Sequence, residues 1–235
     1  MSPRPDLVLL LDVDNTLLDN DAVERDFQAH LEREAGPEAA RRYWSGFEAL
    51  RRELGYADYL GALQRYRREH LHDPRLLLVA GYLLDYPFAG RLYPRALEVP
   101  ATFGRTSVTA ILSDGDVVFQ PRKIQRSGIR AAVDGRVLVY IHKERELADV
   151  ERFYPASHYV LVDDKLRILT AVKERWGPRV TTVFVRQGHY ALDPAIVAAH
   201  PPADLAIDAI ADLLTYDTRA LRDAATLRSA TGTHI

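Results

Sequence analysis

Side chains of catalytically useful types stand directly after four short apolar runs of this sequence. They are Asp12 and Asp14 after residues 7–11, Ser113, Asp114 and Gly115 after residues 108–112, His142 and Lys143 after residues 137–141, and Asp163 and Asp164 after residues 159–162. Short runs of large aliphatic residues bounded by polar ones are typical of strands buried in a parallel sheet. The carboxyl ends of such strands share one edge, where open α/β sheets bind ligands, so we expect these groups to converge.

Such a group of side chains suits phosphoryl transfer. That reaction needs an in-line nucleophile, groups that neutralise the negative charge of the equatorial oxygens and a proton for the leaving alkoxide. Asp12 would attack phosphorus and form an aspartyl-phosphate. Asp14 would protonate the leaving oxygen and later deprotonate the hydrolytic water, a role that favours a raised pKa. A hard cation such as Mg²⁺ seeks oxygen ligands, so we expect it to bridge the acids and the phosphate.

The same residues also have structural interpretations. Short acidic turns are common, and Asp14 or Asn15 would then start a helix without any chemistry. Ser113 and Thr16 would in that case only cap turns. Taken together, however, the four strand ends favour the catalytic interpretation over a set of unrelated turns.

Three basic or loop segments compete for roles near the site. Lys165 rivals Lys143, but the position of Lys143 directly after a strand favours Lys143. Arg122-Lys123 would reach an anionic group, although we expect a solvated helix start there. We expect the loop Gly188-His189-Tyr190, after the fifth apolar run, to lie away from the site.

Apolar runs and helical segments alternate over most of the chain. We expect strands at 7–11, 108–112, 137–141, 159–162, 180–185 and 203–207, and helices at 94–103, 122–127, 146–153, 166–175, 195–199 and from 210 onward. This alternation predicts an α/β fold, with a parallel sheet covered by helices on both faces. We expect the polar tail from Arg219 onward to fray.

The segment between the first two strands differs in character, because charged and apolar residues interleave there at helical spacing. Gly36-Pro37, Gly55 and Asp73-Pro74 would separate about four helices. We therefore expect a helical cap domain at 19–93, and a discontinuous core domain at 1–18 and 94–235. The cap would move as a lid on hinges near 18–20 and 92–94. Candidate cap contacts to a substrate are Tyr43, Trp44, Arg51 and Tyr56.

Composition narrows the class of protein. The 235-residue chain has a formal net charge of −2, which does not indicate nucleic acid or an anionic membrane as a partner. It has no cysteine, so disulfides, thiol nucleophiles and thiolate metal sites are excluded. The N-terminal apolar run is too short for a signal peptide, and no stretch is long enough for a membrane span. We expect a cytoplasmic protein. The sequence carries no signal for an oligomeric state.

At these residues the chain resembles the haloacid-dehalogenase-like (HAD) superfamily. The four motifs of that family match, in order, Asp12-Val13-Asp14-Asn15-Thr16, Ser113, Lys143 and Asp163-Asp164. The resemblance covers the whole sheet domain, and the helical insert resembles the cap that many members carry after the first motif. It implies the Rossmann-like HAD core with a smaller all-α cap.

The resemblance also implies roles for individual residues. Mg²⁺ would be bound by an Asp12 oxygen, the Asp14 backbone carbonyl and Asp164, with Asp163 supporting Asp164. Ser113, with backbone N–H groups near Asp114 and Gly115, would hold the phosphoryl oxygens. Lys143 would balance the charge of nucleophile and phosphate.

We therefore expect a magnesium-dependent phosphatase acting on a small phosphorylated metabolite. Dehalogenating members lack an acid at the second position of the first motif, because halide leaves without a proton, so Asp14 argues against dehalogenation. A phosphomutase would use the same groups. A phospho-ligand binder without catalytic activity is the alternative from another class.

Overall fold

A six-stranded parallel sheet forms the centre of the computed structural model, which describes residues 6–231, with the side chains at 76–77 and 226–231 excepted. The strands are β1 (Leu7–Leu11), β2 (Val108–Asp114), β3 (Val137–Tyr140), β4 (His158–Asp163), β5 (Val180–Val185) and β6 (Leu205–Ile207). All pairings are parallel, and the expected α/β fold is confirmed.

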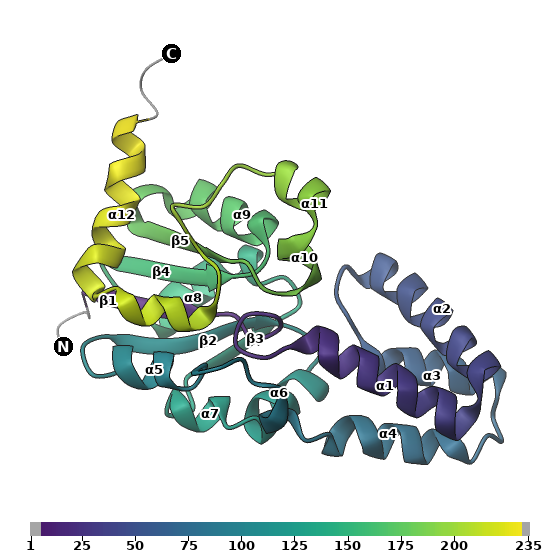
Figure 1. Ribbon diagram of the computed structural model, residues 1–235. Helices are drawn as coiled ribbons and strands as arrows, with labels where there is room; N and C mark the ends of the chain where they lie inside the picture. Colours follow the sequence, from purple (N-terminus) through teal and green to yellow (C-terminus); the bar gives the residue numbers. More distant parts are fainter. Residues whose placement is uncertain (1–5, 232–235) are drawn as a thin grey trace.

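Helices cover both faces of the sheet (Figure 1). One face carries α5 (Glu98–Phe103), α6 (Phe119–Arg126), α7 (Ile129–Ala132), η4 (Ile210–Thr215) and α12 (Thr218–Thr231). The other carries α8 (Leu147–Phe153) and α9 (Leu166–Trp176), while η2 (Lys143–Arg145), η3 (Gly177–Arg179), α10 (Gly188–Leu192) and α11 (Pro194–Ala198) connect the elements. Alternate residues of β1 explain this: Leu9 and Leu11 pack on the first face, and Val8 and Leu10 on the second.

The order of the strands creates a crevice at the carboxyl end of β1. The sheet reads β3-β2-β1-β4-β5-β6, so the direction of winding reverses between β1 and β4. In the register of these two strands Leu11 lies beside Val162, which brings Asp12 next to Asp163. Ligands of open α/β sheets bind at such a switch point. The fold therefore places the acids of two motifs at the position most suited to a ligand.

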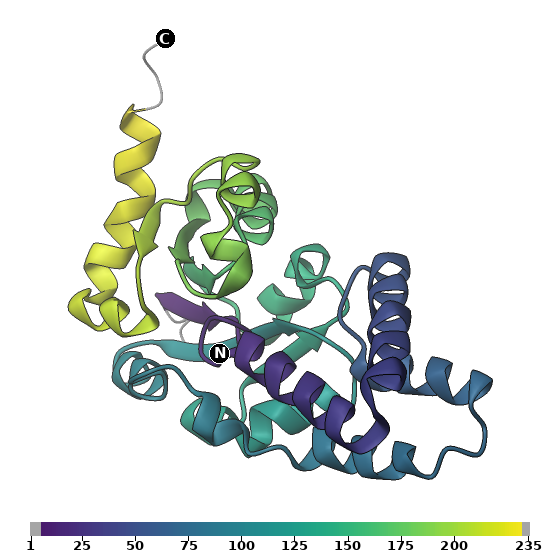
Figure 2. The same cartoon turned by 45° about the vertical axis from the view of Figure 1, so that its right-hand side comes forward.

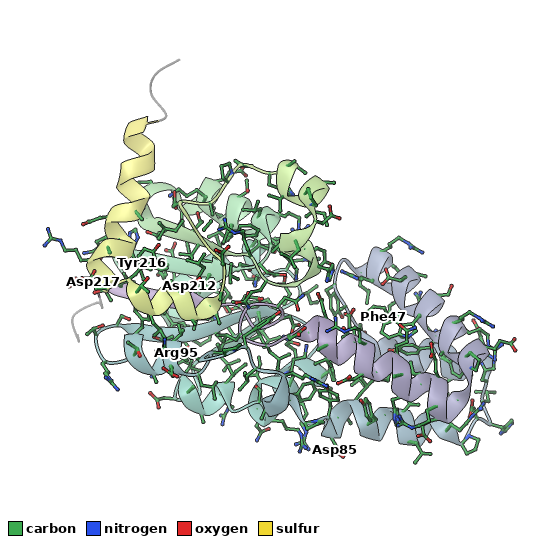
Figure 3. All side chains as sticks on the ribbon, viewed as in Figure 1. Phe47, Asp85, Arg95, Asp212, Tyr216 and Asp217 are labelled. Atoms are coloured by element: carbon green, nitrogen blue, oxygen red, sulfur yellow. The ribbon has the colours of Figure 1, made fainter. Side chains whose placement is uncertain are left out.

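A helical unit is inserted between β1 and β2. It consists of α1 (Asn20–Ala35), α2 (Pro37–Leu54), α3 (Tyr59–Glu69) and α4 (Arg75–Asp85), followed by η1 (Phe88–Arg91). Figures 1 and 2 show it at the opposite end of the molecule from α12, and in Figure 3 the labelled Phe47 lies inside it, far from Asp212. Its interior is aromatic, with the Phe47 ring stacked 4.8 Å from that of Tyr59.

The two connections between this unit and the sheet run side by side. Leu18 and Leu92 form an antiparallel bridge. The Asp19 N–H donates to the Arg91 carbonyl at 2.8 Å, and the Tyr93 N–H donates to the Leu17 carbonyl at 3.0 Å. These are the segments expected to act as hinges; their movement remains a prediction.

Several elements differ from the expectation. Strand β2 continues through Asp114, and α6 begins at Phe119 instead of Arg122. The helix expected from residue 210 onward begins as a separate 3-10 turn. The chain from Thr218 to Thr231 is a regular helix instead of a fraying tail, because Leu221 and Ala225 are buried against the sheet. Residues 232–235 lie outside the described range. Among residues 6–231, no helix combines the length and apolar character needed to cross a bilayer.

Candidate active site

Three carboxylates and one ammonium group meet at the end of β1. Lys143 Nζ donates to Asp12 Oδ1 and to the Leu112 carbonyl, and it lies 2.7 Å from Asp163 Oδ2. All three side chains are buried. The Lys165 N–H donates to the other Asp163 oxygen at 2.8 Å. The structure therefore brings together residues that lie on β1, η2 and β4 and are distant in the sequence.

Several buried acids compete for two ammonium groups, those of Lys143 and Lys165, and this competition governs the electrostatics. Burial raises the pKa of Asp12, and this outweighs the neighbouring Lys143. Burial also raises the pKa of Asp164 well above its usual range, and Asp163 and Asp12 add to the effect. For Lys143, burial alone would lower the pKa, but Asp12 and Asp163 outweigh it and raise the pKa. The cluster thus has more carboxylates than nearby cations can neutralise.

This excess of buried carboxylate fits a divalent cation. One oxygen each of Asp12, Asp163 and Asp164 lie within 4.8 Å of one another. Both Asp164 oxygens and Asp12 Oδ2 are buried and have no hydrogen-bond partner among the described residues. A buried polar atom without a partner is costly, and an all-oxygen donor set suits a hard cation such as Mg²⁺. Asp163 Oδ2 also lacks a hydrogen bond within residues 6–231, but it lies 2.7 Å from Lys143 Nζ, and Asp163 Oδ1 accepts from the Lys165 N–H, so Asp164 is the better ligand.

The second motif forms a neighbouring polar group at the end of β2. Ser113 is buried, and its Oγ accepts a hydrogen bond from Gln120 Nε2 at 2.9 Å. Asp114 Oδ1 accepts from the Lys143 N–H at 2.7 Å, which ties the second motif to the third. A Cβ atom on Gly115 would lie 2.6 Å from Gln120 Cβ, so a side chain at position 115 would force the helix away.

Two side chains of α6, a helix that begins earlier than the sequence predicted, hold the Asp14 carboxylate. Lys123 Nζ donates to Asp14 Oδ1 at 2.7 Å, and Gln120 Nε2 donates to Asp14 Oδ2 at 3.2 Å. The expectation of a solvated Lys123 is wrong, since its side chain is 1% exposed. Arg122 does lie at the surface, paired with Asp85. Because α6 begins three residues earlier than expected, Lys123 falls on its buried second turn.

A cavity of about 290 Å³ lies between the sheet edge and the helical unit. Asp14, Asp114 and Lys165 line its sheet side, and Arg51 and Tyr56 line its helical side. Asp12 is 3% exposed and lies behind this wall, so the acidic cluster is covered in this conformation. The cavity therefore adjoins the cluster, with Asp14 at the boundary between them.

Not all the candidate cap contacts reach the cavity. Tyr43 donates from its hydroxyl to the Tyr59 carbonyl at 3.0 Å, and Trp44 packs edge-on against Phe27 at 5.7 Å. Both belong to the interior of the helical unit instead. Arg51 does line the cavity, because the end of α2 faces the sheet.

The loop after β5 also borders the cavity, contrary to expectation. His189 and Tyr190 are among the lining residues. His189 Nδ1 and its backbone N–H contact the Asp21 carboxylate at 2.7 and 2.8 Å, which joins this loop to α1. Two cations lie over the Tyr190 ring: Lys165 Nζ is 5.0 Å from its centroid, and the Arg51 guanidinium is 5.6 Å from it. One feature of the sequence could have indicated that this loop lies at the cavity: it directly follows a buried parallel strand, at the sheet edge where ligands bind.

Asn15 contacts the start of a helix, as the structural interpretation of the first motif expected for Asp14 or Asn15. Its Oδ1 accepts from the N–H groups of Asn20 and Asp21 at 3.0 and 3.2 Å, and its Nδ2 donates to Asp21 at 2.9 Å. Asn15 thus connects the first motif to the beginning of α1. A positive φ of 59° at Asn15 makes this turn possible, and Asn tolerates that region better than most residues.

Comparison with solved structures identifies one close relative of this chain and more distant structures with the same fold. A haloacid dehalogenase-like protein from Burkholderia xenovorans LB400 is 60% identical, with a TM-score of 0.88, over 92% of this chain and 100% of that chain. YfnB from Bacillus subtilis, classed with the HAD hydrolases and solved with bound magnesium, is 15% identical with a TM-score of 0.61, over 91% of this chain and 98% of that chain. An L-2-haloacid dehalogenase from Xanthobacter autotrophicus is 18% identical with a TM-score of 0.60, over 88% and 96%. The last two share the fold. No protein-family model and no curated protein matches the chain.

Proposed function

The chain belongs to the haloacid dehalogenase-like hydrolases, and we propose that it is a magnesium-dependent phosphatase that hydrolyses a small phosphorylated metabolite through an aspartyl-phosphate. The observation that carries this proposal is the placement of Asp14. Its carboxylate lies on the wall of the cavity, two residues after the buried Asp12. A carboxyl group in that position would serve a leaving group that needs a proton, as an alkoxide does.

Asp14 also separates the proposal from its main rival within the family. Dehalogenases share the fold, as the Xanthobacter enzyme illustrates, and by family resemblance they too use the first aspartate as nucleophile. Halide departs as a stable anion and requires no general acid. A second aspartate held by two side chains of α6 has no evident use in that reaction.

In the first half-reaction, an Asp12 oxygen would attack phosphorus in line while the bond from phosphorus to the leaving oxygen breaks. Asp14 would give its proton to that oxygen. Ser113 Oγ and Lys143 Nζ would hold the equatorial oxygens, with backbone N–H groups near Asp114 and Gly115 adding donors. When bound, Mg²⁺ would supply further neutralisation of the phosphoryl charge, held by Asp12, Asp164 and the Asp14 carbonyl, with Asp163 in support.

In the second half-reaction, Asp14 would take a proton from a water molecule that attacks the phosphorus of the aspartyl-phosphate. Cleavage of the bond between phosphorus and the Asp12 oxygen would release inorganic phosphate and restore both carboxyl groups. Because Asp12 is covered in this conformation, the substrate would enter when the helical unit moves away from the sheet. We propose that residues 19–93 form this movable cap.

An assay with p-nitrophenyl phosphate tests the proposal. We expect hydrolysis with Mg²⁺, little with EDTA, and a fall of at least about 10³-fold in the Asp12→Asn variant. Asp208→Asn is the control, because Asp208 is exposed and pairs with Arg186 at the surface. Hydrolysis that persists in Asp12→Asn would overturn the nucleophile.

A panel of phosphorylated sugars, acids and nucleotides then separates the remaining alternatives. Release of inorganic phosphate supports the phosphatase, whereas transfer of the phosphoryl group within the substrate would indicate a mutase. No reaction with any ester would favour a non-catalytic phospho-ligand binder. We propose no nucleic-acid or membrane partner, because the positive and negative charges of the chain nearly balance. We propose a cytoplasmic location, since a chain without cysteine needs no oxidising compartment.

A further inference from the structure

Lys123 is a fully buried lysine at the junction of the sheet domain and the helical unit. Its relative exposure is 0%, and its Nζ donates to Asp14 Oδ1 at 2.7 Å and to Asn20 Oδ1 at 2.8 Å. A buried ammonium group is costly unless acceptors surround it. These two acceptors belong to the first motif and to the first residue of α1. The mechanism described above assigns no role to Lys123.

The helix that carries Lys123 holds both oxygens of Asp14. Gln120 and Lys123 are three residues apart on α6, so their side chains lie on the same face of the helix. Lys123 binds Asp14 Oδ1, and Gln120 binds Oδ2 and also Ser113 Oγ. Lys123 Nζ lies 5.1 Å from the centroid of the Phe119 ring, which further limits its movement. The Asp14 carboxylate is therefore fixed at two points, although 25% of its side chain remains exposed toward the cavity.

The second acceptor extends this arrangement into the helical unit. Asn20 Nδ2 lies 3.4 Å from the Tyr59 hydroxyl and 3.3 Å from Glu24 Oε1. Tyr59 and Glu24 both line the cavity. A single ammonium group thus connects the second aspartate of the motif to the cavity wall of the inserted unit.

From this geometry we propose that Lys123 is a positioning residue, which holds the Asp14 carboxyl group where it meets the leaving oxygen of the substrate. The proposal rests on the phosphatase function above. Lys123 contacts no reacting atom and acts through Asp14. Its loss would leave Gln120 as the remaining side-chain contact of Asp14 among the described residues, so the carboxyl group would turn more freely.

This role predicts a dependence on the leaving group that a merely structural lysine would not produce. An alkoxide must receive a proton as it departs, whereas p-nitrophenolate is stable enough to leave without one. Misplacement of Asp14 should therefore slow glycerol 3-phosphate hydrolysis much more than p-nitrophenyl phosphate hydrolysis. A general loss of structure would slow both to the same extent.

The experiment compares kcat/KM for these two esters, with Mg²⁺, in the full-length wild type and five variants. They are Lys123→Met, Lys123→Arg, Asp14→Asn, the double variant Lys123→Met/Asp14→Asn, and Arg122→Gln as the matched surface control from the same helix. We expect Lys123→Met to lower the value for glycerol 3-phosphate at least about 10-fold more than that for p-nitrophenyl phosphate, within the range that a general acid contributes. Lys123→Arg should recover part of the lost kcat/KM for glycerol 3-phosphate, and Arg122→Gln should match the wild type on both esters.

The double variant decides whether the effect passes through Asp14. We expect its selectivity to equal that of Asp14→Asn alone, because residues in contact act non-additively. Equal losses on both esters in Lys123→Met, or additive selectivity in the double variant, would overturn the positioning role. If Lys123→Met does not fold by circular dichroism, the Lys123→Arg variant decides: a larger loss on glycerol 3-phosphate than on p-nitrophenyl phosphate supports the positioning role, and an unchanged ratio of the two overturns it. Absence of Asp12-dependent hydrolysis in the wild type would instead overturn the phosphatase itself.

Discussion

Asp163 and Asp164 are adjacent in sequence, yet their surroundings differ. Asp163 contacts Lys143 at 2.7 Å and accepts from the Lys165 N–H, so its charge is compensated within the protein. Both oxygens of Asp164 are buried without a hydrogen-bond partner in the described part of the chain. We therefore expect a division of roles, in which Asp164 would bind the cation and Asp163 would orient Lys143.

Substitution of each acid should separate these roles. We expect Asp164→Asn to weaken Mg²⁺ binding by more than about 100-fold, because a ligand is lost. Asp163→Asn should weaken it by about 10–100-fold, as expected for a residue that supports a ligand. Isothermal titration calorimetry with Mg²⁺ measures both. A larger loss in Asp163→Asn than in Asp164→Asn would reverse the assignment.

At this scale the sequence predicted the residues of the site better than their partners. Asp12 and Asp164 follow the buried strands β1 and β4, and Lys143 follows the half-buried β3. The ends of parallel strands share an edge, so their convergence follows from topology. The contacts of Asp14 with Lys123 do not follow in this way. They depend on where α6 begins. The Asp116 carboxylate accepts from the N–H groups of Val118 and Phe119 at 2.8 and 2.7 Å, which places that start at Phe119, three residues before the expected one. A shift of three residues is nearly one helical turn, so Lys123 lies in the buried second turn of α6 and not at a solvated helix start.

Among the elements, the turn that begins α10 approaches the Asn15 side chain of the first motif closely. Gly188 has a φ of 73°, and a Cβ atom there would collide with the Asn15 side chain. The approach brings His189 and Tyr190 to the cavity and Asp21 to His189. A glycine at this position is therefore needed for both conformation and space.

Replacement of Gly188 by alanine should displace this turn. We expect a loss of stability of about 1–3 kcal/mol and reduced hydrolytic activity, because the new side chain meets Asn15 and the backbone is strained. Gly46→Ala is the matched control. Position 46 lies inside α2 with open space around it, so alanine should stabilise the protein by about 0.5–1 kcal/mol. Thermal unfolding measures both, and an unchanged midpoint for Gly188→Ala would contradict the expectation.

The end of α2 should contribute to substrate binding. The Arg51 guanidinium lies over the Tyr190 ring on the cavity, and its Glu48 contact is long, at 3.5 Å. We expect Arg51→Gln to raise KM for phosphorylated acids several-fold, with a smaller change in kcat, since a uniform binding contact is lost. Arg52→Gln, at an exposed neighbouring position, should leave both constants unchanged. Steady-state kinetics would contradict this expectation if kcat fell and KM did not rise.

The sequence predicted the helical insert and the sheet. It did not predict which side of each helix faces the cavity. Tyr43 and Arg51 are two turns apart on α2, yet the first is in the aromatic interior and the second on the cavity. Both positions carry residue types that suit either place. Only the packing of α2 between α1, α3 and the sheet edge decides between them.

For the whole molecule, the buried acids make stability depend on pH and on divalent cations. Burial raises the pKa values of Asp12 and Asp164 in the folded chain. These groups therefore keep their protons over a pH range in which the unfolded chain has lost them. Stability then falls as pH rises from the ordinary aspartate range through the raised pKa values. A cation bound only by the folded chain removes this cost.

We accordingly expect the midpoint of thermal unfolding in EDTA to be lower at about pH 8 than at about pH 5.5, with a shift of about 2–4 °C for each kcal/mol. Added Mg²⁺ should raise the midpoint more at the higher pH. Differential scanning fluorimetry measures both effects. The Asp164→Asn variant is the control, and a wild-type response to Mg²⁺ in that variant would contradict the explanation.

The paired connections at Leu18 and Leu92 have a consequence for how this architecture diversifies. Both ends of the inserted segment leave the sheet side by side and are joined by backbone hydrogen bonds. The sheet domain therefore needs only to bring these two ends together, as it would for a tight turn. The entropy of closing such a loop depends only weakly on the number of residues between its ends. Helices can thus be lengthened, exchanged or removed there over evolutionary time without disturbing strand order, and new chemical preferences can arise while the reaction centre stays the same.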